Sequence, residues 1–219
     1  MESSLKLIEN GKKPDEPYNA ALGYWLPPNS PYGNFQLKFM KIIQRLDEAN
    51  RKIIDSYKFW GACKTPDGFP AIGAYEQHIF SNEEAIYMLR RAADELVSLI
   101  WCLSKYEETN NYPTKIKIDC LGAVLSQNAE NRLKVFEPHI AIMTILNEIA
   151  NAFKHSFINS DHSLLGVDEP CIHALALDYN KLASEPIFHN VSLSGVVEKY
   201  NEFYISCNSW LKEYSERNR

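Results

Sequence analysis

Apolar residues recur at helical spacing along most of this chain. Between positions 85 and 106 they alternate at steps of four and three residues, which is the pattern of a helix packed in a bundle. Similar spacing predicts a first helix over 34–60 and a fourth helix over 138–157, with Pro138 in the first turn of the fourth. We therefore expect a mainly α fold, a helical bundle of four to five helices.

Local signals predict where the helices begin and end. The sequence "SNEE" at 81–84 has the form of a capping box, so the second helix is expected to begin there with Ser81 as its N-cap. The stretch 61–80 contains several prolines and glycines and is expected to end the first helix and form a long connection. A shorter third helix is predicted over 114–126, followed by a polar loop over 127–137.

The two ends of the chain differ from this helical middle. Residues 1–33 hold five of the eleven prolines and several aromatic residues, so they predict an extended N-terminal arm that packs on the rest of the protein. Near the other end, strand-forming residues on both sides of a turn-like segment predict a small C-terminal β-hairpin near 171–193. A final helix is predicted over 194–216. Residues 34–219 are therefore expected to form a single helical-bundle domain.

Composition and charge limit the possible functions. With 219 residues, 45% of them hydrophobic, the chain can bury a sizeable core and is not of the disordered class. A net charge of -5 argues against binding of nucleic acid by the whole surface. The predicted first helix is locally basic: its apolar face includes Leu37, and a stripe of cations runs through Lys38, Lys41, Arg45 and Lys52. This stripe is either a solvated face or a surface that contacts phosphates.

Several classes of protein and site are disfavoured. No apolar run reaches the roughly 18–20 residues of a membrane span, and the N-terminus lacks the apolar stretch of a signal peptide, so we expect a cytoplasmic protein without a membrane partner. The five cysteines are widely spaced and form no CxxC pair, which disfavours disulfides and a cysteine zinc site. The chain carries no glycine-rich phosphate loop and no HExxH motif, so we expect no metal and no cofactor.

The most unusual feature is a polar arc on the predicted fourth helix, opposite its apolar face. Asn147, Asn151 and His155 are spaced four residues apart, which aligns three hydrogen-bonding side chains, and Lys154 lies beside them. A plain surface face would more often use glutamate, lysine and glutamine, because asparagine is a poor helix former. The row is therefore interpreted as a polar network or a site, or alternatively as a solvated helix end.

The end of this helix resembles the motif of HEPN domains, all-helical domains of prokaryotic defence and toxin systems and of nucleotide-binding proteins. The family motif has an arginine, usually a polar residue directly after it, and a histidine five positions after the arginine. Asn151 and His155 match the polar residue and the histidine, whereas Ala150 occupies the arginine position. The resemblance covers the helical bundle over about 34–157, and the motif in this chain is degenerate.

The resemblance implies a homodimer in which the motifs of two protomers meet and cut RNA without a metal. Histidine suits the proton transfers, because its pKa lies near neutrality, so His155 would be the general acid or base and Asn151 would orient it. The arginine of the family motif suits the charge on the phosphate. Because Ala150 lacks that charge, a substitute would have to come from Lys154 or from Arg90 and Arg91, which are predicted to pair with acidic residues on the second helix.

Three functions from different classes follow. The first is a HEPN-like protein that binds RNA, a nucleotide or a protein partner without chemistry, using Asn147, Lys154, Arg90 and Arg91. The second is an active metal-independent ribonuclease or toxin that uses His155. The third is a helical scaffold whose polar arc is only a hydrogen-bonded packing face. The environment of Asn151 and His155 distinguishes them, because a site needs exposure and a packing face needs burial and partners.

Overall fold

The computed structural model describes residues 5–13, 16–18, 23–64, 73–155, 169–176 and 185–218. It confirms the predicted class, a mainly α bundle with a small C-terminal β-hairpin. The α-helices are α1 (Phe35–Cys63), α2 (Ala74–Thr109), α3 (Leu121–Leu125), α4 (Ile140–His155) and α5 (Leu193–Arg217). The strands of the hairpin are β1 (Cys171–Ala176) and β2 (Ile187–Ser192), and short 3-10 turns lie at Ala129–Asn131 and Glu137–His139.

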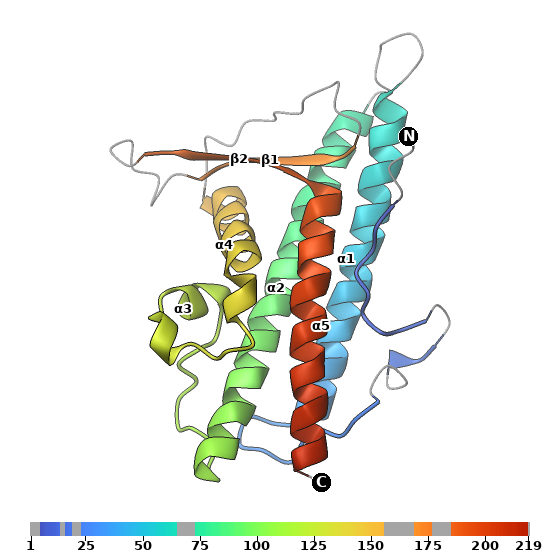
Figure 1. Ribbon diagram of the computed structural model, residues 1–219. Coiled ribbons are helices and arrows are strands. Elements are labelled where there is room, and N and C mark those ends of the chain that lie inside the picture. Colours follow the sequence, from blue (N-terminus) through green and yellow to red (C-terminus); the bar gives the residue numbers. More distant parts are fainter. Residues whose placement is uncertain are drawn as a thin grey trace.

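The long helices α1, α2 and α5 run side by side, and α4 packs against α2 near the hairpin end of the bundle (Figure 1). Their facing sides meet in one core, in which Phe39 of α1, Leu96 of α2 and Tyr200 of α5 are almost completely buried. The Tyr200 hydroxyl donates to the carbonyl oxygen of Leu89 at 3.1 Å, so its one polar atom is satisfied inside the core. The apolar residues that recur at steps of four and three residues on α2 thus form its packed, buried face.

The predicted start of the second helix is wrong. Helix α2 begins at Ala74, after Gly73 in the left-handed conformation (φ 77°), and Ser81 lies inside the helix with its hydroxyl donating to the Gln77 carbonyl oxygen at 2.7 Å. The buried seam of α2 extends backward through His78 and Asn82. Because those side chains are polar, the hydrophobic pattern did not reveal that their positions belong to the core.

Two substitutions test this helix start. Ser81→Ala is expected to change the free energy of unfolding by no more than about 0.5 kcal/mol, because alanine suits a helix interior. Asn34→Ala is the matched control, since the Asn34 side chain is the N-cap of α1 and accepts from the Leu37 amide at 3.0 Å. Its loss should cost about 1 kcal/mol in a urea titration. If Ser81→Ala lowered the free energy of unfolding as much as Asn34→Ala does, the capping-box interpretation would be restored.

Other predicted boundaries also need correction. Helix α1 continues past Gly61 because Trp60 and Cys63 are buried, and Leu37, expected on the core face, is 60% exposed. The predicted third helix is reduced to α3, since residues 114–120 are not helical although Ile118 among them is buried. Ile116 also packs against the core, so apolar side chains recur along this irregular segment, and their presence alone did not distinguish it from a short helix.

The described residues before α1 pack against α1 and α5. The Asn50 side chain of α1 binds Ile8 at both backbone groups, accepting from its amide at 2.7 Å and donating to its carbonyl oxygen at 3.0 Å. The Tyr24 hydroxyl donates to Asn208 of α5 at 2.6 Å, and Leu26 is fully buried. These contacts attach the segment to the bundle through both polar and apolar groups.

The hairpin lies across the ends of α4 and α5 (Figure 1). Its antiparallel register pairs Cys171 with Ser192 and Ala176 with Ile187. Ile172 and Ala174 alternate on the buried face of β1, which is the period expected for a strand that covers a core on one side. The turn-like segment of the prediction, residues 180–185, falls largely outside the described residues.

Candidate functional site

The amino-terminal half of the polar arc on α4 is committed to contacts within the bundle. Asn147 Oδ1 accepts a hydrogen bond from an Arg90 Nη2 donor on α2 at 2.8 Å. One residue later, Glu148 Oε2 lies 2.9 Å from His189 Nε2 of β2. The sequence placed Asn147 among candidate binding residues, but in the fold it joins α4 to α2.

Arg90 is the centre of this junction. Its side chain is only 15% exposed, and its guanidinium forms an ion pair with Asp94, one helical turn away on α2. Asp94 Oδ1 also accepts from the Leu121 amide at 2.7 Å, which attaches the start of α3 to the same pair. Burial lowers the pKa of Arg90 from its usual value, and the nearby Cys120 acts in the opposite direction.

The structure separates the two arginines that the sequence treated alike. Both predicted pairs are present, since Arg91 Nε donates to Glu95 at 3.0 Å on the neighbouring face of α2. The Arg91 side chain is 64% exposed, however, whereas Arg90 points into the junction with α4. Sequence spacing predicts i,i+4 pairing but does not show which of two adjacent pairs a third helix covers.

The carboxyl-terminal half of the arc is exposed. Asn151 and Lys154 are both on the surface, and within the described residues neither has a hydrogen-bond or ion-pair partner. His155 is the last residue of α4, and its side chain lies outside the described part of the structure. Ala150, at the arginine position of the family motif, is 5% exposed and faces the core.

The spacing along α4 limits what Arg90 can do. At 1.5 Å per residue, Asn147 lies about 6 Å along the helix axis from Asn151 and about 12 Å from His155. Arg90 meets the row at Asn147, the end away from His155. The structure therefore brings Arg90 to one candidate residue, Asn147, and not to the carboxyl end of the row.

A second polar cluster escaped the sequence analysis. Ser56 of α1, His78 and Asn82 of α2 are all at least 96% buried where the hairpin meets the two helices. The Ser56 hydroxyl donates to Asn82 Oδ1 at 2.6 Å, and Asn82 Nδ2 lies 3.3 Å from His78 Nε2 and donates to the Cys171 carbonyl oxygen at 3.2 Å. The cluster fixes β1 on the ends of α1 and α2.

One protonation state of His78 satisfies every contact in this cluster. Its Nδ1 lies 3.2 Å from the Ser56 carbonyl oxygen, an acceptor, so Nδ1 carries the proton and Nε2 accepts from the Asn82 amide. A second proton on Nε2 would face the Asn82 donor. Burial lowers the pKa of His78, with the nearby His173 acting in the same direction and the Ser56 carbonyl opposing it. His78 is a neutral structural histidine.

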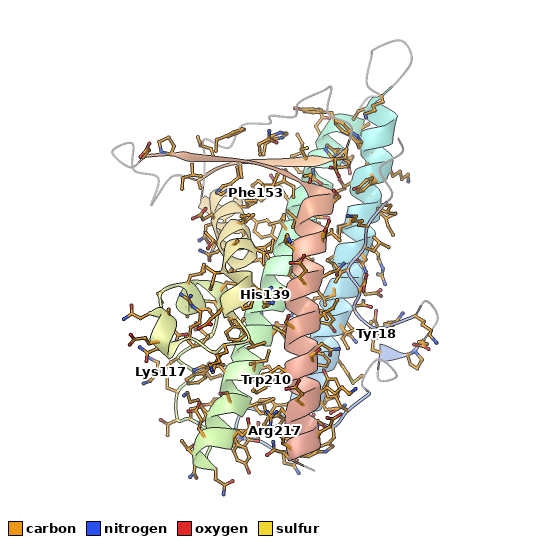
Figure 2. The ribbon with its side chains drawn as sticks, in the orientation of Figure 1. Tyr18, Lys117, His139, Phe153, Trp210 and Arg217 are labelled. Carbon is orange, nitrogen blue, oxygen red and sulfur yellow. The ribbon has the colours of Figure 1, made fainter. Side chains whose placement is uncertain are left out.

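Another histidine, His139, lies between the start of α4 and the middle of α5 (Figure 2). Its Nε2 is 2.9 Å from the Ser206 hydroxyl, and its ring contacts that of Phe203 with centroids 5.8 Å apart. Burial lowers the pKa of His139, opposed by Glu202 and reinforced by Lys199. Phe153 lies nearer the hairpin (Figure 2), with its ring centroid 6.4 Å from that of Tyr87 on α2.

The basic stripe of α1 divides in the same way as the arc of α4. Arg45 Nε donates to Glu95 at 2.9 Å, and Lys52 lies 2.5 Å from Glu84, so both cations link α1 to α2. Lys38 and Lys41 have no ion pair with any described carboxylate. Arg45 and Lys52 therefore have a structural role, whereas Lys38 and Lys41 are available to a ligand.

Comparisons with protein-family models, with curated proteins and with solved structures found no match. In the described part of the chain, no three histidine, cysteine, aspartate or glutamate side chains gather as ligands for a metal ion. No helix among the described residues is long and apolar enough to cross a bilayer. The candidate site therefore rests on the geometry of α4 and α2 alone.

Proposed function

We propose that this chain is a HEPN-like helical protein of the cytoplasm that binds RNA or a nucleotide as a homodimer, with a degenerate nuclease motif. The observation that supports this proposal is the division of the arc on α4. Asn147 is hydrogen-bonded to α2 and Glu148 lies beside His189 of β2, whereas Asn151 and Lys154 are exposed and have no partner among the described residues. A packing face would have paired these last two side chains as well.

The exposed residues have the chemistry that RNA binding needs. The Lys154 ammonium can neutralise a phosphate, which supplies affinity that weakens as salt increases. The Asn151 amide offers two donors and an acceptor, and can therefore read the edge of an unpaired base or a 2′-hydroxyl. Both side chains lie within one helical turn of His155, the third residue of the proposed surface.

Binding without cleavage is the form of the proposal that the charges support best. A nuclease of this type needs a cation to balance the negative charge that develops on the phosphate. Ala150 supplies none, and Arg90 already serves Asp94 and Asn147 at the other end of the row. The alternative is an active ribonuclease with His155 as general acid or base and the exposed Lys154 as the substitute cation.

RNA binding can be measured directly. The double variant Asn151→Ala/Lys154→Glu is expected to bind a fluorescent single-stranded RNA about tenfold more weakly at low salt, because it loses a phosphate contact and a base contact. Lys212→Glu, an exposed position on α5 at the opposite end of the bundle, makes the same change of charge and should bind as the wild type does. Equal affinity of the double variant and the wild type would rule out this surface.

A cleavage assay separates the two HEPN-like functions. We expect the wild type to bind RNA and leave it intact. If it instead produces 2′,3′-cyclic phosphate ends that disappear in His155→Ala, the ribonuclease function replaces the binding function. Absence of both binding and cleavage by folded dimeric protein would leave the helical scaffold.

A further inference from the structure

A groove of about 460 Å³ lies on a different face of the bundle, between α1, α2 and the segment 116–119. Its floor is apolar and made of the buried side chains of Phe35, Ile42, Leu99 and Cys102. The volume falls within the range of small-molecule sites, about 300–1,000 Å³. The groove extends along α2 from Arg91 to Cys102, about 16 Å at 1.5 Å per residue.

Some of the charged side chains that line this groove already have an ion-pair partner, and others do not. Of its three acidic residues, Glu95 is already bound by Arg45 and Arg91, and Asp94 by Arg90, whereas the exposed Asp119 has no ion pair with a described cation. Lys38 and Lys41 also line the groove, one helical turn apart on α1, and neither has a carboxylate partner among the described residues. The charged groups left to a ligand are thus two lysines together on α1 and one carboxylate on the segment 116–119, so the unpaired charge on the α1 side of the groove is positive.

The position of the aromatic side chains indicates which kind of apolar group the ligand carries. Tyr32 and Phe35 line the groove at the end where Lys38 lies, since Phe35 begins α1. The Tyr32 hydroxyl donates to the Pro113 carbonyl oxygen, and the Phe35 ring contacts that of Tyr112 with centroids 5.8 Å apart. Both rings are held in place, and the partly exposed ring of Tyr32 is the one that offers surface for stacking or edge contact with a flat ring, since Phe35 is buried.

We infer that this groove binds a small anion that carries a flat apolar ring. The ring lies on the floor near Phe35 and Cys102, and the phosphate or carboxylate head lies between Lys38 and Lys41. Two ammonium groups one turn apart can each donate to a different oxygen of one head group. This site does not depend on the RNA surface of α4, because none of its residues belongs to that helix.

Isothermal titration with 1-naphthyl phosphate tests the assignment on the full chain. The wild type is expected to bind it at least tenfold more tightly than inorganic phosphate, since the ring contributes buried apolar area. A parallel titration with 1-naphthoate shows whether a phosphate or a carboxylate head is preferred, and tight binding of either supports the site. No binding of either compound at millimolar concentration, or equal binding of inorganic phosphate, would overturn it.

Two variants locate the binding. Lys38→Gln/Lys41→Gln is expected to lower the affinity about tenfold or more, because two charge-assisted contacts are lost. Ser98→Phe should block the groove without changing its charge. Lys58→Gln, an exposed lysine on α1 outside the groove, is the control and should bind normally.

RNA affinity measured on the same proteins separates this proposal from the function proposed for α4. The groove variants should keep full RNA affinity, and Asn151→Ala/Lys154→Glu should keep full affinity for 1-naphthyl phosphate. Unchanged binding of 1-naphthyl phosphate by the lysine double variant, with its thermal midpoint close to that of the wild type, would show that the compound binds elsewhere.

Discussion

Asp94→Ala is expected to lower the free energy of unfolding by about 3 kcal/mol, one of the largest effects of any polar substitution in this protein. The change removes the ion-pair partner of a guanidinium whose side chain is 85% buried, and removing one member of a buried pair costs more than the pair itself contributes. It also leaves the Leu121 amide without its acceptor. Urea unfolding at pH 7 measures the loss.

A double-mutant cycle shows whether the cost comes from the stranded charge. Asp94→Asn keeps an oxygen for the Leu121 amide and should lose less than Asp94→Ala. Arg90→Met combined with Asp94→Asn removes both charges but keeps an oxygen for the Leu121 amide, and should therefore lose less stability than Asp94→Ala alone; Arg90→Met by itself completes the cycle. A loss below about 0.5 kcal/mol for Asp94→Ala would mean that water solvates Arg90 fully.

Helix identity was predictable wherever the buried face is apolar over several turns. The packed face of α2, the final helix and strand β1 all have apolar positions whose period matches the positions that are buried, so the class of fold followed from periodicity. The start of α2 did not, because after Ala74 its next buried positions are the polar residues His78, Ser81 and Asn82. His78 and Asn82 are buried together with hydrogen-bond partners from α1 and β1, which lie far away in the sequence.

The candidate site was predictable only in part for a related reason. The helical spacing of residues 138–157 separated a polar arc from an apolar face, but it treated the arc as uniform. Whether a given polar residue is exposed depends on the neighbouring elements: α2 covers Asn147 and β2 covers Glu148, whereas no described element pairs with Asn151. The same applies to the cations of α1, where acidic residues of α2 take Arg45 and Lys52 and leave Lys41.

Acidification is expected to destabilise the protein steeply, through His78 and His139. Burial lowers the pKa of both rings below the usual 6.5, so the folded protein holds them neutral while the unfolded chain takes up protons. Stability is therefore complete above pH 6.5 and falls as the pH drops through 6.5 toward the lowered pKa of each folded ring. Each histidine adds a slope of up to about 1.4 kcal/mol per pH unit in that window.

The slope can be assigned to individual residues by urea unfolding between pH 7.5 and about 5, above the range in which most carboxylates titrate. His78→Gln and His139→Gln should each reduce the pH dependence of the free energy of unfolding, whatever their effect at pH 7.5, because glutamine cannot be protonated. His78 should show the larger reduction, since a second proton on its Nε2 meets the Asn82 amide donor, whereas Nε2 of His139 meets a hydroxyl that can turn to accept. A ring titration by NMR that placed the pKa of His78 at or above 6.5 would contradict the neutral assignment, and with it the account of how this cluster holds β1 on the helices.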